Sequence, residues 1–193
     1  RSLTDIFESA KAGQVNPERD HVLIGKERHD IGRPGNRGYP IRGIVKGGML
    51  YLRNYEPDRW PAGPPETGYP NVDGSPTKTE VLQSRTKDTP LPYWQLGFGK
   101  RPSEELFDIR NDRACVTNLA DDLEYAPRKQ ELAAELTEAL EAQGDPRMFG
   151  NGSIFEDAYP VHQERLVDYY DKAMRGEAEE LGWINQSDIE TIP

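Results

Sequence analysis

The alternation of apolar and polar residues predicts four short strands. The expected strands cover residues 21–25, 41–45, 49–55 and 103–109. Gly47-Gly48 separates the second run from the third, so these two strands should form a hairpin. In the third strand Met49 and Tyr51 share one face, and Leu50 takes the other.

Helical spacing predicts helices over residues 2–13, 127–143 and 161–175. In the middle one, Pro127 stands in the first turn and Leu132, Leu136 and Leu140 form one stripe. In the last one, the apolar face would comprise Leu166, Val167, Tyr170 and Met174. The order of elements predicts an α+β fold. A small antiparallel sheet of three to four strands would be packed by a C-terminal helix, and its other face or an edge would stay open.

Residues 56–102 break the pattern, because nine prolines fall in this stretch and no apolar period persists. We expect a long irregular Pro-rich loop with a helical turn near Lys78 to Gln83. Its aromatic residues, such as Tyr93 and Trp94, favour a segment laid across another surface over a disordered one. Residues 176–193 form an acidic tail that we expect to be mobile, with Trp183 and Ile184 able to dock it.

Composition narrows the class of protein. The chain has 193 residues, of which 35% are hydrophobic and 30% charged, so we expect one domain with a small core. The net charge of −10 disfavours nucleic-acid binding, although residues 1–102 carry 16 Lys and Arg against 12 Asp and Glu. No apolar run approaches the ~20 residues of a membrane span, and no signal peptide is evident. A chain that begins at Arg1 and not at Met is expected to be a processed product or a natural or engineered fragment.

Cysteine and histidine are scarce. Cys115 is the only cysteine, which excludes an internal disulfide and a Cys-rich zinc site. The three histidines are His21, His29 and His162. We interpret His21 as structural and His162 as solvated, so a His-rich metal site is not expected.

The candidate site is the stretch from Gly25 to Arg42, between the first two strands. It gathers Arg, His and carboxylate side chains and is interrupted by Gly and Pro, as in a loop carried on strands. Such a cluster is typical of a binding site. The residue types alone leave open a solvated connection between strands.

Several motifs, in order along the chain, resemble the C-terminal part of sulfatases, in the branch related to heparan N-sulfatases. The longest is Glu104 to Asp122, with Glu-Leu-Phe-Asp-Ile, a turn and Asn-Leu. The others are Ser2-Leu3, Gly25 to Asp30, Tyr39 to Ile44, Tyr51 to Tyr55, Pro57 to Gly63 and Gly144 to Arg147. Together they cover roughly residues 1–160.

The resemblance implies that residues 1–160 are the C-terminal subdomain of an alkaline-phosphatase-like sulfatase fold, followed by a helix and acidic tail over 161–193. Residues 56–102 would lie on a sulfatase N-terminal catalytic domain. The Cys/Ser-x-Pro/Ala-x-Arg signature, whose first residue becomes formylglycine, is missing, since Val116 and Thr117 follow Cys115. Formylglycine and calcium are therefore implied in that absent domain, and this chain is expected to bind neither.

The resemblance also implies roles in the loop. Arg28 and His29 would contact a sulfated sugar, and Asp30 or Glu27 would accept hydroxyl hydrogen bonds. Arg42 would be a second anion contact or a charge on the strand face. The Tyr93-Trp94 pair would anchor its loop or stack on sugars.

The parent protein would hydrolyse sulfate esters or sulfamates on a carbohydrate, in the periplasm or outside the cell, and this chain alone would be inactive. It would have no nucleic-acid or membrane partner. Two other interpretations remain open. One is a noncatalytic module that binds an acidic glycan, and the other is a structural partner of a separate catalytic chain.

Overall fold

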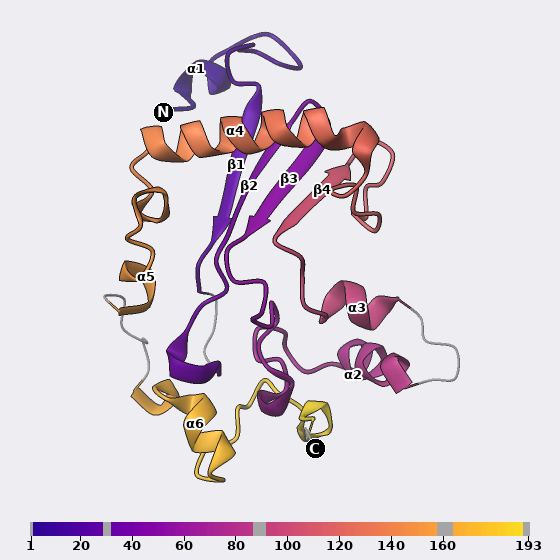
Figure 1. Ribbon diagram of the computed structural model, residues 1–193, viewed down its shortest axis with the longest axis vertical. Helices are drawn as coiled ribbons and strands as arrows, with labels where there is room; N and C mark the ends of the chain where they lie inside the picture. The colour runs from indigo at the N-terminus through magenta and orange to yellow at the C-terminus, as the bar shows by residue number, and fades with distance from the viewer. Residues whose placement is uncertain (1, 29–31, 87–91, 158–163, 191–193) are drawn as a thin grey trace.

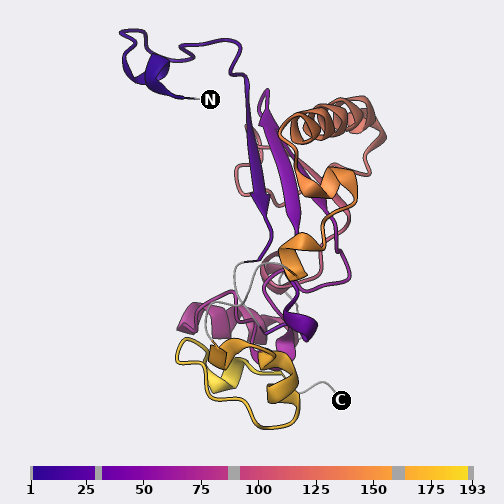
Figure 2. The same cartoon turned by 90° about the vertical axis from the view of Figure 1, so that its left-hand side faces the viewer.

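The computed structural model describes residues 2–28, 32–86, 92–157 and 164–190. The molecule is elongated, with a sheet and a long helix at one end and short helices and loops at the other (Figures 1 and 2). The strands are β1 (His21–Lys26), β2 (Ile41–Lys46), β3 (Met49–Asn54) and β4 (Glu104–Asp108). The α-helices are α1 (Thr4–Phe7), α2 (Pro76–Gln83), α3 (Tyr93–Gly97), α4 (Ala126–Ala142), α5 (Ile154–Asp157) and α6 (Tyr169–Met174). Short 3-10 turns are η1 (Pro34–Asn36), η2 (Pro65–Thr67), η3 (Ser84–Thr86), η4 (Leu123–Tyr125), η5 (Pro146–Phe149), η6 (Glu164–Leu166) and η7 (Gln186–Asp188).

The four strands form one antiparallel sheet in the order β1-β2-β3-β4, which confirms the expected α+β class. Gly47 and Gly48 close the β2–β3 hairpin with φ of 60° and 79°. Two successive positive φ values suit a tight hairpin turn and favour glycine at both positions. The register places Ile44 opposite Tyr51 and Tyr51 opposite Leu106, so these three side chains share one face.

Helix α4 covers that face and closes the main core (Figure 2). Its predicted stripe of Leu132, Leu136 and Leu140 is buried against the sheet, where Ile44 and Leu106 are fully buried. Burying each such side chain contributes about 1.5–3 kcal/mol before entropy is counted. The C-terminal helix therefore packs on the sheet as its periodicity predicts.

The opposite face of the sheet is open near β1. Val22 exposes 60% of its surface and Ile24 exposes 40%, although both are apolar and point to the same side. Farther across, at the β4 edge, Phe107 is buried. Within the described residues, nothing therefore covers the β1 side of this face.

In residues 56–102, α2 confirms the helical turn expected near Lys78 to Gln83. The described part of this stretch is more ordered than the expected irregular loop, because it also carries α3 and packs on itself. Tyr69 and Phe98 are buried in a second cluster, with ring centroids 5.0 Å apart. Trp60 meets Trp94 edge-on at 6.2 Å. Trp94 thus anchors its segment, while Tyr93 is 54% exposed. Edge-to-face aromatic contacts give this segment a core of its own.

The C-terminal region also differs from expectation. A continuous helix over 161–175 is wrong for the part the structure describes, since Asp168 has a φ of 55° and separates η6 from α6. Residues 161–163, with His162, lie outside the described residues. The tail is docked up to Glu190. The Trp183 indole donates to the Pro70 carbonyl at 3.1 Å, and Asp188 is 1% exposed.

The N-terminal segment forms one helical turn in place of the expected helix over 2–13. Phe7 is 80% exposed and Leu3 is 52% exposed. A short amphipathic segment gains most of its helical stability from packing. In the described part of the chain, no surface buries its apolar residues.

Candidate functional site

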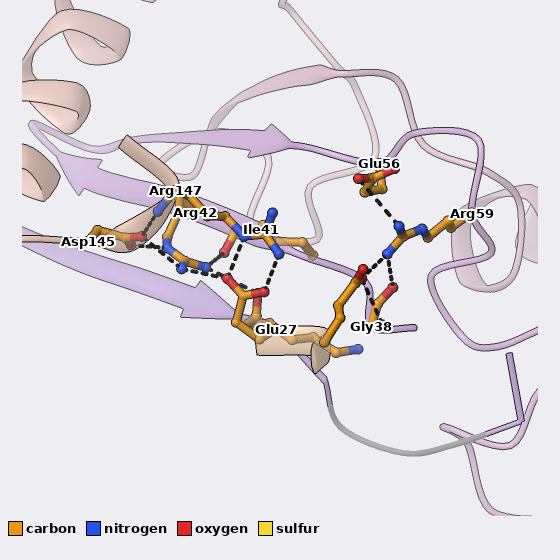
Figure 3. A network of polar contacts seen from close by, with 10 residues as sticks. Glu27, Gly38, Ile41, Arg42, Glu56, Arg59, Asp145 and Arg147 are labelled. Atoms are coloured by element: carbon orange, nitrogen blue, oxygen red, sulfur yellow. Dashed lines mark hydrogen bonds and ion pairs between the residues drawn. The ribbon is translucent and has the colours of Figure 1, made fainter. Parts of the chain in front are cut away.

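Glu27 anchors the loop between β1 and β2 at its base. Arg147 donates from Nε and Nη2 to its two carboxylate oxygens, at 2.7 and 2.6 Å. Arg42 Nη2 lies 2.6 Å from Glu27 Oε1 (Figure 3). The carboxylate is therefore shared by two guanidinium groups, in the bidentate geometry that makes such contacts strong.

Arg42 uses all five of its N–H groups within the molecule. It donates to Asp145 through Nε and Nη2 at 2.5 and 3.3 Å. Its Nη1 donates to the carbonyls of Lys26 and Ile41 at 3.3 and 2.9 Å. Burial of Arg42 opposes its charge, but the hydrogen bonds that it donates to Asp145 and Glu27 raise its pKa. In this structure Arg42 joins elements together, and it presents no unused donor.

The residues that follow α4 explain why Asp145 and Arg147 lie next to the loop. Gly144 has a φ of 72° and follows the end of α4, and Asp145 then caps η5 by accepting from the Arg147 amide at 3.0 Å. Burial opposes the charge of Asp145, yet Arg42 holds its pKa below the usual value. The Phe155 ring lies under both guanidinium groups, at 5.7 Å from Arg42 and 5.6 Å from Arg147.

Arg28 makes a contact within the loop itself. Its Nη1 donates to the Asn36 carbonyl at 3.2 Å, and its side chain is half-buried. The structure thus brings Glu27 and Arg42 together, and it places the Arg28 guanidinium next to η1. His29 and Asp30 lie outside the described residues.

A second pair of arginines joins the loop to residues 57–63. Arg59 donates to the Gly38 carbonyl at 3.0 Å and pairs with Glu156 (Figure 3). Arg33 is 3% exposed and donates to the carbonyls of Trp60 and Pro61 at 3.0 Å. These contacts hold two loops in a fixed relative position.

A cavity of about 220 Å³ lies beside this junction. Its wall comes from η1 and its flanks, from residues 58–66 and from α6. It is lined by Arg33, Pro34, Arg37, Asp58, Arg59, Trp60, Pro64, Glu66 and Tyr170. Asn36 and Asp168 join two of these segments by reciprocal hydrogen bonds of 2.7 and 2.9 Å. Sequence reasoning did not identify this cavity.

One group of potential metal ligands occurs among the described residues, formed by Asp20, His21 and Glu135. The Lys46 ammonium already lies between its carboxylates, 2.9 Å from Asp20 and 2.5 Å from Glu135. Lys46 and His21 lower the pKa of Asp20 to about 2. An ammonium ion in this position does not fit a calcium site, so this group is an ion-pair cluster.

Cys115 occupies a turn, as expected for a residue without a catalytic signature. Its φ is 52°, and its amide donates to the Asp112 carbonyl at 3.1 Å. Burial, followed by the charge of Asp112, raises the pKa of its thiol. A raised pKa disfavours the nucleophilic thiolate.

Sequence reasoning singled out Glu27 and Arg42 but not their partners Asp145 and Arg147. The signal was present, because both partners belong to the Gly-Asp-Pro-Arg motif after α4. Likewise Arg59 and Trp60 belong to the Pro57 to Gly63 motif. Both motifs carry side chains that contact the loop.

No protein-family model matches the chain. The chain is 30% identical over 136 residues to the ulvan-active sulfatase of Formosa agariphila, an alignment that covers 67% of this chain and 20% of that protein. It thus spans about a fifth of the length of this curated relative. None of the helices in the described residues has the length and apolar character needed to cross a membrane. The similarity is to part of a sulfatase, and it does not single out the heparan N-sulfatase branch.

Proposed function

We propose that this chain is the noncatalytic, substrate-contacting part of a sulfatase that acts on a sulfated carbohydrate. The observation that carries the proposal is the identity of 30% to a sulfatase over 136 residues. The α+β architecture, with an antiparallel sheet packed by one helix, is compatible with the C-terminal subdomain of that family. Hydrolysis of a sulfate ester or a sulfamate would both fit this proposal.

Arg28 and His29 are the residues we assign to the sulfated sugar, with Asp30 accepting hydrogen bonds from hydroxyl groups. Arginine suits sulfate because its planar fork donates in pairs to neighbouring oxygens. Arg28 follows the end of β1 by two residues, and its guanidinium donates to the Asn36 carbonyl within the same loop.

Glu27 and Arg42 serve this site as positioning residues. Both are engaged in ion pairs at the base of the loop. These ion pairs fix the residues where the loop begins and ends. Less conformational entropy is therefore lost when the loop binds a ligand. Direct contact of Arg42 with an anion would require it to give up a bond to Asp145 or to a backbone carbonyl.

The remaining chemistry would come from outside this chain. In the family that the sequence resembles, a formylglycine hydrate supplies the nucleophile and calcium stabilises the sulfate charge. The open face around Val22 and Ile24 is the surface we assign to the catalytic domain. A location in the periplasm or outside the cell accords with a polysaccharide substrate.

The test is sulfate release from sulfated oligosaccharides by the gene product that contains this chain together with the formylglycine signature. Replacing His29 by Ala or Arg28 by Ala should lower kcat/KM by roughly tenfold or more, the effect of losing one charge-assisted hydrogen bond. Arg113 is exposed at the far end of β4 and provides the matched control, Arg113→Ala.

Two outcomes would contradict the proposal. Unchanged kcat/KM in both loop variants would remove the loop from the substrate site. Sulfate release by the 193-residue chain alone would mean that it carries its own nucleophile. A gene product that binds acidic glycans without any turnover would support the noncatalytic module.

A further inference from the structure

The cavity between η1, residues 58–66 and α6 has the composition of a saccharide site. We propose that it binds one anionic sugar residue of a longer saccharide, through the carboxylate or sulfate ester of that sugar. The inference rests on the proposed function for the nature of the polymer. The site shares the loop of residues 25–42 with the residues assigned above, but other residues of that loop line it.

Arg37 is the cation that we assign to the anionic group. The other two arginines of the wall are already engaged, Arg33 with backbone carbonyls and Arg59 with Gly38 and Glu156. Arg37 lines the cavity and is exposed, and among the described residues its side chain has no hydrogen bond or ion pair. Its guanidinium is therefore available for a planar, two-oxygen anion.

Carboxylates on the same wall suit sugar hydroxyl groups. Asp58 is exposed, and its side chain, like that of Arg37, has no hydrogen bond or ion pair within the described part of the chain. Glu66 also lines the cavity, where it lies beside Tyr170. Burial, followed by the Glu66 charge, raises the pKa of Tyr170. A wall with one available cation and two carboxylates matches a ligand with one anionic group and several hydroxyls.

Trp60 supplies a rigid aromatic surface. It meets Tyr69 edge-on at 6.3 Å and Trp94 at 6.2 Å, and the Lys100 ammonium lies 5.2 Å from its ring centroid. Arg33 also binds the Trp60 carbonyl. The ring is thus fixed before any ligand arrives, which lowers the entropic cost of binding. Aromatic rings pack against the apolar C–H faces of pyranose sugars, and their edges leave room for hydroxyl contacts.

The size of the cavity limits the ligand to a small unit. Its volume of about 220 Å³ lies below the range of roughly 300–1,000 Å³ that is usual for sites binding drug-sized molecules. A single sugar ring is the appropriate scale, and the rest of a saccharide would extend into solvent.

The test is amide heteronuclear NMR of the 193-residue chain titrated with glucuronate, glucose 6-sulfate and neutral glucose. We expect concentration-dependent shifts at residues 33–37 and 58–66 with at least one of the two anionic sugars. Arg37→Gln should weaken that binding by about tenfold, the loss of a charge-assisted pair of hydrogen bonds. Arg113→Gln removes an equally exposed arginine at the opposite end of the sheet and should leave binding unchanged.

Each outcome of the titration supports or contradicts the proposed saccharide site. Shifts with glucuronate alone assign the carboxylate as the anchor, and shifts with glucose 6-sulfate alone assign the sulfate. No binding of either anionic sugar, equal binding of glucose, or equal effects of the two arginine variants would overturn the site. Asp58→Asn provides a second variant that should weaken binding without disturbing a structural contact. Because no turnover is measured, loss of this site would leave the proposed sulfatase role intact, and an inactive parent protein would leave the site intact.

Discussion

Arg147 donates to both carboxylate oxygens of Glu27, across a sequence separation of 120 residues. This pair joins η5, which follows the long helix, to the end of β1, from which the candidate loop departs (Figure 3). Arg42 contacts the same carboxylate from β2. The position of the loop is therefore set by charged groups from three distant segments.

Glu27→Gln should lower the free energy of unfolding by about 3 kcal/mol, because it removes the shared anion from two largely buried guanidinium groups. Urea denaturation followed by circular dichroism measures the change. Glu8→Gln, at an exposed position, is the control and should change stability by less than about 0.5 kcal/mol. Equal stability of the two variants would show that the network contributes little to folding.

Lys78→Met should destabilise the chain by about 3–5 kcal/mol. The Lys78 ammonium is almost fully buried, donates to the carbonyls of Gly68 and Val72 at 2.7 Å, and lies 3.6 Å from Asp188. Methionine would leave these acceptors and the Asp188 carboxylate without their cation. Burial lowers the pKa of Lys78, although Asp188 opposes this.

The consequence should be local to the docked tail. Limited proteolysis should cut residues 176–190 faster in the Lys78→Met protein than in the wild type. Lys11→Met, at an exposed lysine, should leave the cleavage rate unchanged. A protected tail in the Lys78 variant would contradict this role of the buried pair.

Gly38→Ala should disturb the candidate loop more than the addition of one methyl group suggests. A Cβ at Gly38 would lie 2.5 Å from the Glu27 carbonyl oxygen, which is backbone and cannot move aside cheaply. We expect a loss of roughly 1–3 kcal/mol, as for overpacking, with NMR shift changes concentrated at residues 27–28 and 36–40. Gly97→Ala is the matched control, since no atom lies within 4 Å of its added Cβ. Identical spectra for Gly38→Ala and the wild type would refute the close approach.

Alkaline pH should unfold the protein through its buried tyrosines. Burial raises the pKa of Tyr39 from 10.0 to about 12, and it raises the pKa values of Tyr51 and Tyr69 further. The unfolded chain loses these protons near pH 10, whereas the folded chain retains them. Their contribution to stability is therefore complete below pH 10 and is lost as pH rises towards 12.

Denaturant unfolding at a series of alkaline pH values measures this effect. Tyr39→Phe should reduce the slope of stability against pH above 10. At neutral pH its cost should be small, because the buried Tyr39 hydroxyl has no hydrogen-bond partner among the described residues. A slope unchanged by the substitution would mean that Tyr39 ionises equally in both states.

Local patterns were sufficient for the sheet and its covering helix. Alternation in β2 and β3, the Gly47-Gly48 turn and the leucine stripe of α4 are short-range features, and each matches the period of the element it forms. The same rules failed for residues 2–13 and for the described part of the predicted helix over 161–175, residues 164–175. Helical spacing is present there, but packing and the left-handed Asp168 limit the helices to short turns.

The candidate loop could be predicted from the sequence only in part. Its position between two strands, and its charge, were readable from the chain, and so were the motifs that contact it. The pairing of Glu27 with Arg147 and the cavity beside Arg37 were not readable, because each depends on segments brought together from distant parts of the chain.

Short-range sequence thus establishes which elements form, since turn chemistry and side-chain period act within a few residues. Which charged groups are neutralised inside the molecule, and which stay available, depends on long-range packing. Arg42 and Arg37 illustrate the difference, because both are arginines of the same Gly-rich stretch. Packing places Arg42 among Glu27 and Asp145, and it leaves Arg37 on the wall of a cavity.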